Sequence, residues 1–201
     1  MGDLFFDARF LGLAAGILST FAYIPYIIDT IAGRTKPQRA SWLIWSVLGS
    51  IAFFSQIHEG ATSSLWFAAA QVSGTITVLL LSIWKGHGSY LRQADYLALG
   101  AAAFGLVLWY FTETATYALA ITISISLLGG LLTVSKSYEN PDSETLSTWI
   151  VSLVASGCAL AAVGKFDPVL LAYPAYLFTL YALFIAAILL GRLRRTSIAS
   201  A

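Results

Sequence analysis

Charged residues are scarce in this sequence: lysine, arginine, aspartate and glutamate make up 10% of its 201 residues, against about 25% in a typical soluble domain. So few charges cannot cover the surface of a water-soluble globule. Hydrophobic residues make up 58% of the chain and gather in long runs. Because roughly 20 apolar residues span the ~30 Å hydrocarbon core of a bilayer, these runs predict a membrane protein.

Other absences exclude whole classes of function. The single cysteine, Cys158, cannot form an intrachain disulfide, and with two separated histidines it does not make a metal site. No Ser–His–acid set can be placed on one side of a membrane, and no phosphate-binding glycine loop is present. The sequence contains no run of basic residues of the kind that binds nucleic acid. We therefore expect no enzyme, cofactor, metal or nucleic-acid partner. The N-terminus lacks the basic segment of a signal peptide, so we expect the first helix to stay in the protein.

Seven apolar runs separated by short polar loops predict seven transmembrane helices. Helices are expected because each satisfies its own backbone hydrogen bonds inside the bilayer, and the alternation typical of a β-barrel is absent. The runs are Phe10–Ala32, Ser41–Ile57, Ser63–Trp84, Tyr96–Phe111, Thr116–Val134, Leu146–Val163 and Pro168–Leu190.

The lysines and arginines predict how the chain is oriented. With seven spans, nine of the eleven lie on one side, and only Arg9 and Lys165 lie on the other. The positive-inside rule then puts the C-terminus in the cytoplasm and the N-terminus outside a cell (inner) membrane. The nine are Arg34, Lys36, Arg39, Lys85, Arg92, Lys136, Arg192, Arg194 and Arg195.

The two halves of the chain align when one is shifted by 104 residues. This shift lays Pro37 on Pro141 and Trp45 on Trp149, and it matches the first three predicted helices with the last three. We therefore expect a first three-helix repeat over 1–92, a linker helix over 93–113 and a second three-helix repeat over 114–201. A single linker span makes the two repeats parallel in the membrane. Trp42, Trp45 and Trp149 begin helices, and we expect them to anchor at the membrane interface.

Three segments carry a resemblance to a known family. Pro25 near the end of the first helix precedes a short basic segment, the third helix contains Gln71-Val72-Ser73-Gly74, and the seventh contains Tyr173-Pro174-Ala175-Tyr176. With the 3+1+3 plan, these resemble the SWEET, SemiSWEET and PQ-loop superfamily, in particular bacterial seven-helix members. The resemblance implies an all-α membrane fold and transport of a small molecule by alternating access. The chain departs from the family pattern at Tyr26, where glutamine is usual, and at Ala175, where an amide is usual.

The resemblance also implies a site at the midplane between the repeats. The expected substrate-binding residues are Gln71, Ser73, Ser55, Tyr173, Ala175 and Tyr176. Pro25, Pro174 and Gly129 are the expected hinges, and Asp29 is a candidate proton site because it is an acid inside a span. Each has a plainer alternative. Gln71 could bridge two helices, the prolines could be static kinks, Gly129 could serve packing, and Asp29 could reach Arg34, Lys36 or interfacial water.

The sequence thus favours a uniporter or proton-linked carrier for a neutral or weakly polar metabolite. The lack of a buried cation argues against an anionic substrate. The alternative is a non-transporting receptor, or a protein that binds lipid or another partner on the same scaffold. The expected partners are a small-molecule substrate and membrane lipid. A chain with two repeats can form a pathway alone, so a monomer suffices, and a homo-oligomer is not excluded.

Overall fold

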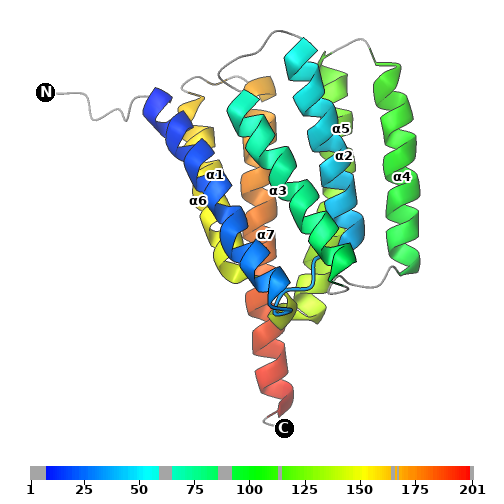
Figure 1. Ribbon diagram of the computed structural model, residues 1–201, viewed down its shortest axis with the longest axis vertical. Coiled ribbons are helices and arrows are strands. Elements are labelled where there is room, and N and C mark those ends of the chain that lie inside the picture. Colours follow the sequence, from blue (N-terminus) through cyan, green and yellow to red (C-terminus); the bar gives the residue numbers. More distant parts are fainter. Residues whose placement is uncertain are drawn as a thin grey trace, which may run out of the picture.

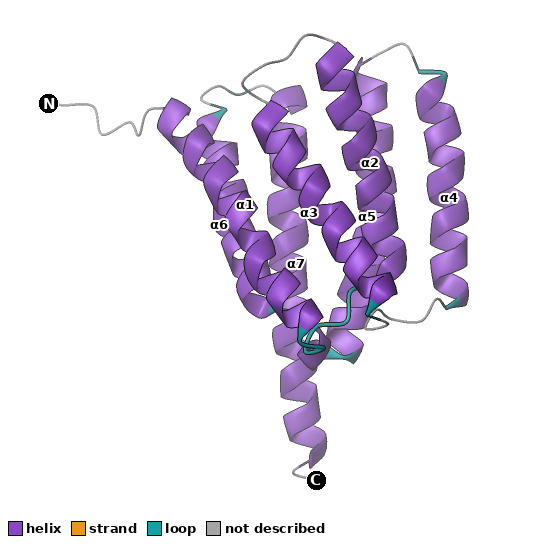
Figure 2. Cartoon of the chain, in the orientation of Figure 1, coloured by secondary structure: helices purple, strands orange, loops and turns teal. Residues whose placement is uncertain are grey.

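The computed structural model describes residues 8–58, 65–85, 92–112, 115–163, 166 and 168–199. This part of the chain is all-helical (Figures 1 and 2), as predicted. Its seven α-helices each overlap one of the seven apolar runs. They are α1 (Ala8–Ile31), α2 (Arg39–His58), α3 (Leu65–Trp84), α4 (Gln93–Tyr110), α5 (Ala115–Glu139), α6 (Leu146–Ala162) and α7 (Pro168–Ala199), with a 3-10 turn η1 (Pro141–Ser143) before α6.

Three of these helices are long and apolar enough to cross a membrane by length and composition: α1, α5 and α7, over Phe10–Ile31, Leu119–Glu139 and Leu171–Ser197. Shorter apolar helices cover Gln71–Trp84 and Leu146–Ala162. The outer surface fits the same environment. Along α1, exposed apolar side chains recur at helical spacing, at Leu13, Ile17, Phe21, Ile24 and Ile28. A continuous apolar stripe of this kind needs lipid or another apolar surface against it, so the chain is a membrane-associated helical protein.

The helices form two groups, and in the view of Figure 1 α1, α2 and α3 lie in front of α5, α6 and α7. In one group α3 packs against both α1 and α2, and in the other α7 packs against both α5 and α6. The groups meet where α1 contacts α6 and α2 contacts α5. Helix α4 lies at the edge of the bundle and contacts α5 and α2.

The larger of two buried hydrophobic clusters lies toward one end, which we call the C-terminal end because α7 projects from it (Figure 1). Its core consists of Tyr26, Trp42, Val78, Trp149, Leu180, Phe184 and Ile188, all buried. The expectation that Trp42 and Trp149 anchor at the interface was wrong, because each side chain turns inward and only 3% of its surface stays exposed. The two groups of helices meet over these rings, so the rings bury apolar area that an interfacial position would leave wet.

Polar contacts fix α4 at the C-terminal end. Asp95 is buried, accepts a hydrogen bond from Gln38 Nε2 at 2.6 Å, and caps α4 by accepting one from the backbone N–H of Arg92 at 2.6 Å. The Arg92 guanidinium also pairs with Glu139 at the end of α5, at 2.6 Å. The edge helix is therefore tied to both groups through one short segment of chain.

Candidate functional site

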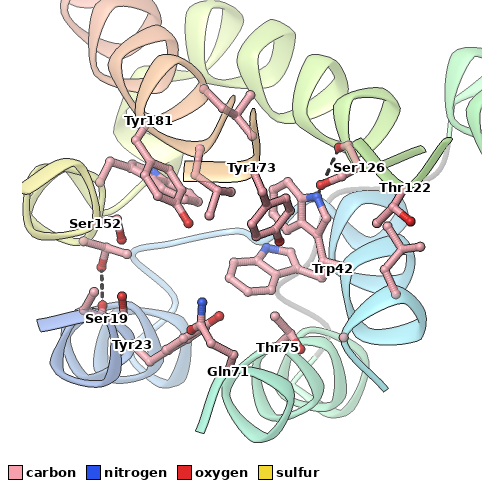
Figure 3. Close-up of a pocket in the computed structure, with 18 of the residues that line it drawn as sticks. Ser19, Tyr23, Trp42, Gln71, Thr75, Thr122, Ser126, Ser152, Tyr173 and Tyr181 are labelled. Carbon is pink, nitrogen blue, oxygen red and sulfur yellow. Dashed lines mark hydrogen bonds between the residues drawn. The ribbon is translucent and has the colours of Figure 1, made fainter. Parts of the chain in front are cut away.

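A cavity of about 340 Å³ lies between the two groups of helices, on the other side of the buried core from the C-terminus. Six helices line it, and the edge helix α4 does not. Among the described residues, no charged side chain lines this cavity. Figure 3 shows the polar members and the rings that face it. The lining consists of Ser19, Ala22, Tyr23, Trp42, Trp45, Leu48, Gly49, Gln71, Thr75, Leu119, Thr122, Ser126, Thr148, Trp149, Ser152, Tyr173, Leu177, Leu180 and Tyr181.

Aromatic rings form the base of the cavity and much of its walls. The buried ring of Tyr26 lies beneath, with its centroid 4.9 Å from that of Trp42 on α2 and 5.7 Å from that of Trp149 on α6. Tyr23 meets Trp42 edge-on at 6.3 Å, and Tyr181 lies 6.0 Å from Trp149 with 31° between the ring planes. Edge-on and tilted pairs at such distances are favourable geometries. The base is therefore a packed set of rings with contributions from both groups of helices.

The three indole N–H groups of the lining all donate hydrogen bonds to other groups of the protein. Trp42 donates to the Tyr26 hydroxyl at 3.3 Å, Trp45 to the Ser126 carbonyl at 3.2 Å and Trp149 to the Glu144 carboxylate at 3.1 Å. Since an indole has one donor and no acceptor, the three tryptophans present only ring surface to the cavity.

Several hydroxyls of the lining also donate hydrogen bonds to backbone carbonyls of the protein. Thr75 donates to the carbonyl of Val72 in its own helix at 3.0 Å, and Thr148 donates to the Ala22 carbonyl at 3.0 Å, which joins α6 to α1. Gln71 differs from them. Its amide projects from α3 toward the cavity (Figure 3), and within the described part of the chain it forms no hydrogen bond. An amide in an apolar bundle favours a partner, so Gln71 is the strongest candidate to bind a ligand.

Below the aromatic base, a buried ion pair closes the C-terminal end. Lys136 of α5 pairs with Glu144, whose side chain is fully buried, while that of Lys136 is 8% exposed. The expectation that the chain has no buried cation was therefore wrong, although this cation already has a partner and does not line the cavity. Glu144 also accepts hydrogen bonds from Trp149 Nε1 and from the Tyr26 hydroxyl at 3.4 Å. The Lys136 ammonium also donates to the backbone carbonyl of Lys36 in the α1–α2 loop. A paired and hydrogen-bonded arrangement of this kind is what allows charges to be buried.

Contacts between the two loops at this end continue the closure. Gly33, with φ of 74°, ends α1 in the left-handed conformation that glycine adopts readily. The residues after Gly33 contact the loop between α5 and α6. The Lys36 N–H donates to the Ser143 carbonyl at 2.9 Å, and the hydroxyls of Thr35 and Thr145 form a hydrogen bond. Thr145 also donates to Asp29 at 2.9 Å. The cavity is thus separated from the C-terminal end by two successive layers, one aromatic and one polar.

The structure brings only part of the predicted substrate site together. Gln71 and Tyr173 line the cavity, and Tyr176 stands next to it, where its hydroxyl donates to Ser126 Oγ at 2.8 Å. Ser73 is exposed on the outer side of α3, because its neighbours at 72, 74 and 75 occupy the inner face. Ala175 of α7 is not part of the lining. The side chain of Ser55 lies outside the described residues.

The predicted hinges and proton site occupy the following positions. Pro25 lies inside α1 and Pro174 inside α7. A Cβ on Gly129 would lie 3.2 Å from Trp45 Nε1 and 3.3 Å from Ser41 Cα, a close approach that favours the packing role. Asp29 pairs with Arg34 at 2.6 Å, which is one of the plainer alternatives considered for it.

Sequence reasoning missed several residues of the site. Tyr23 and Tyr181 lie within the apolar runs and nothing in the sequence distinguishes them from residues that only pack, yet both line the cavity. Glu144 lies in an acidic loop, where a carboxylate is ordinarily solvated, yet its side chain is fully buried. Its position two residues before α6 was the available signal, because that is where a side chain can turn beneath the bundle. Comparison with protein-family models, curated proteins and solved structures finds no match to this chain.

Proposed function

We propose that this protein is a membrane carrier for a small, uncharged metabolite, which it binds in the central cavity. One observation supports this most strongly. A cavity without charged lining lies between two groups of helices and is closed toward the C-terminal end by side chains from both. Alternating access requires a central site closed on one side at a time. Charged solutes would meet no partner there, and burying an unpaired charge is costly.

The pattern of helix contacts supports a seven-span 3+1+3 architecture with parallel repeats, like that of the SWEET and PQ-loop proteins. Exchanging α1, α2 and α3 for α5, α6 and α7 leaves the pattern unchanged. In each group the third helix packs on the other two, and each first helix contacts the second helix of the other group. Helix α4 falls outside this scheme, as a linker between repeats does.

We propose that the C-terminal end faces the cytoplasm of a bacterial cell, across its inner membrane, with the N-terminus outside. The nine cations assigned to that side by the positive-inside rule support this orientation. A cysteine placed at Ala199 in a Cys158→Ser background tests it. A membrane-impermeant thiol reagent should label it in opened vesicles and not in intact cells, and labelling in intact cells would reverse the orientation.

Within the carrier hypothesis, Pro25 and Pro174 are hinges in helices that line or border the cavity, because a proline removes one helical hydrogen bond. Both lie close to lining residues, Tyr23 and Tyr173. Asp29 has an ion-pair partner in Arg34, which favours a uniporter over a proton-linked carrier. A uniporter predicts uptake that is unaffected by a pH gradient across the membrane.

The first test identifies a ligand and then measures flux. A thermal-shift screen of the purified protein against neutral metabolites detects binding, because a ligand at a hundredfold excess over its Kd stabilises the fold by about 2.7 kcal/mol. Uptake of each hit into proteoliposomes then tests transport. Gln71→Leu should weaken binding and reduce uptake. Ser73→Ala, on the exposed side of the same helix, is the matched control and should change neither.

The double closure at the C-terminal end also favours a second candidate, a non-transporting receptor or lipid-binding protein. A buried ion pair that holds both loops together is a feature that a static binding protein would keep. The two candidates differ in one result. Saturable binding that depends on Gln71, with no flux and no counterflow in proteoliposomes, would favour the receptor.

A further inference from the structure

We propose that the ligand of the central cavity is a planar, uncharged nitrogen heterocycle that carries adjacent N–H and C=O groups, as in a cyclic amide or nucleobase. This inference rests on the proposed function only for the identity of the site. It concerns which chemistry binds there, whether or not the ligand is carried across the membrane.

The ring surfaces at the cavity supply the first argument. Trp42 and Trp149 flank the ring of Tyr26 from opposite groups of helices, and Tyr23 and Tyr181 continue the two walls. All three indole donors of the lining are already used by Tyr26, Ser126 and Glu144. Flat aromatic surface without donors suits a flat ligand, which it can contact by offset or edge-on stacking.

The polar groups supply the second argument. Thr75 and Thr148 donate to backbone carbonyls, and Ser126 Oγ accepts from Tyr176. Single hydroxyls of Ser19, Ser152, Tyr23, Tyr173 and Tyr181 also line the cavity, so the aromatic surface, rather than a shortage of hydroxyls, disfavours a polyhydroxylated ligand. Gln71 offers one donor and one acceptor side by side, both uncommitted within the described residues. That pair matches the N–H and C=O edge of a cyclic amide.

Size and charge set the remaining limits. A water molecule occupies roughly 30 Å³ of liquid, so a cavity of 340 Å³ holds on the order of ten ligand atoms other than hydrogen. One or two fused rings fit this volume. Because no charged residue of the described lining could pair with an ion, the ligand must be neutral.

Four probes of closely related shape test the proposal on the full-length protein in nanodiscs, by isothermal titration calorimetry. Uracil carries both the flat ring and the amide edge. Dihydrouracil keeps the edge and loses planarity, 1,3-dimethyluracil keeps the ring and loses its N–H donors, and myo-inositol is a neutral polyol. Uracil should bind. Dihydrouracil should bind at least about fivefold more weakly through lost stacking, and 1,3-dimethyluracil at least about tenfold more weakly because the Gln71 acceptor is left unpaired.

Variants separate this chemistry from the fold. Gln71→Leu should reduce uracil affinity about tenfold or more and remove the difference between uracil and 1,3-dimethyluracil, whereas Ser73→Ala should leave both unchanged. Equal affinities for uracil and dihydrouracil, tighter binding of myo-inositol, or no binding of uracil would each overturn the proposal. Uracil binding without flux would sustain it and defeat the carrier, while uptake of myo-inositol would defeat it and sustain the carrier.

Discussion

Replacing Lys136 with methionine is the most informative change at the closed end. Methionine keeps most of the length of the lysine side chain and removes its charge. The buried carboxylate of Glu144 would then retain two neutral donors, Trp149 Nε1 and the Tyr26 hydroxyl, and lose its only cation in the described part of the chain. Removing one partner of a buried ion pair typically destabilises a fold by about 3–5 kcal/mol. We expect a loss in this range for Lys136→Met.

The reverse change, Glu144→Gln, should cost less. Lys136 keeps the backbone carbonyls of Lys36 and Ser143 as acceptors, and the glutamine oxygen can still accept a hydrogen bond. We expect about 1–3 kcal/mol, typical of a weakened buried polar network. The double variant should cost less than the sum of the two single changes, because residues of one network are coupled.

Reversible unfolding in mixed micelles of rising SDS fraction, followed by far-UV circular dichroism, measures these free energies. Circular dichroism is preferable to fluorescence here because Trp149 takes part in the network. Arg92→Met is the matched control, since its pair with Glu139 is exposed, at 64% and 40% of the two side chains. Exposed pairs contribute about 0–1 kcal/mol. If Lys136→Met and Arg92→Met destabilise the fold equally, the reasoning about the buried pair is refuted.

A further prediction concerns packing. A Cβ on Gly74 would lie 2.8 Å from the ring of Tyr23, so Gly74→Ala should destabilise the fold by about 1–3 kcal/mol and weaken ligand binding, by unfolding and calorimetry. Gly100→Ala, with nothing within 4 Å, is its control and should be neutral or stabilising.

The helices were predictable because lipid imposes a simple rule on sequence. A span must be long and apolar, and each apolar run overlaps one helix of the described chain. The ends of helices that extend beyond the apolar runs were less predictable. Helix α7 continues to Ala199, beyond the expected end at Leu190, because nothing in the arginine-containing stretch of its sequence stops a helix. There Arg195 reaches back to Asp142 at 2.8 Å, which holds η1 against the extension.

The cavity was harder to predict, because its chemistry depends on which way aromatic side chains turn. A tryptophan in the first turn of a helix suits the membrane interface and the core equally by composition. Trp42 is buried because Tyr26 of another helix offers both a ring and a hydroxyl to its indole. The spacing of residues within α2 does not show that Tyr26 of α1 will lie against Trp42. The place of Gln71 in the lining was predictable, because an amide in an apolar run tends to face the interior of the bundle.

The polar closure is asymmetric in a way that bears on the proposed carrier. In the 104-residue register, the positions equivalent to Lys136 and Glu144 are Ala32 and Ala40. Both charges therefore come from the second half of the chain, while the first half contributes the Lys36 carbonyl and N–H and the Tyr26 hydroxyl. Opening the cavity toward the C-terminal end would separate these three groups from their partners and leave the ion pair intact. The charges can then stay paired through the cycle, so the barrier to opening is set by the contacts between the two loops and by the separation of the rings above them, rather than by breaking a buried ion pair.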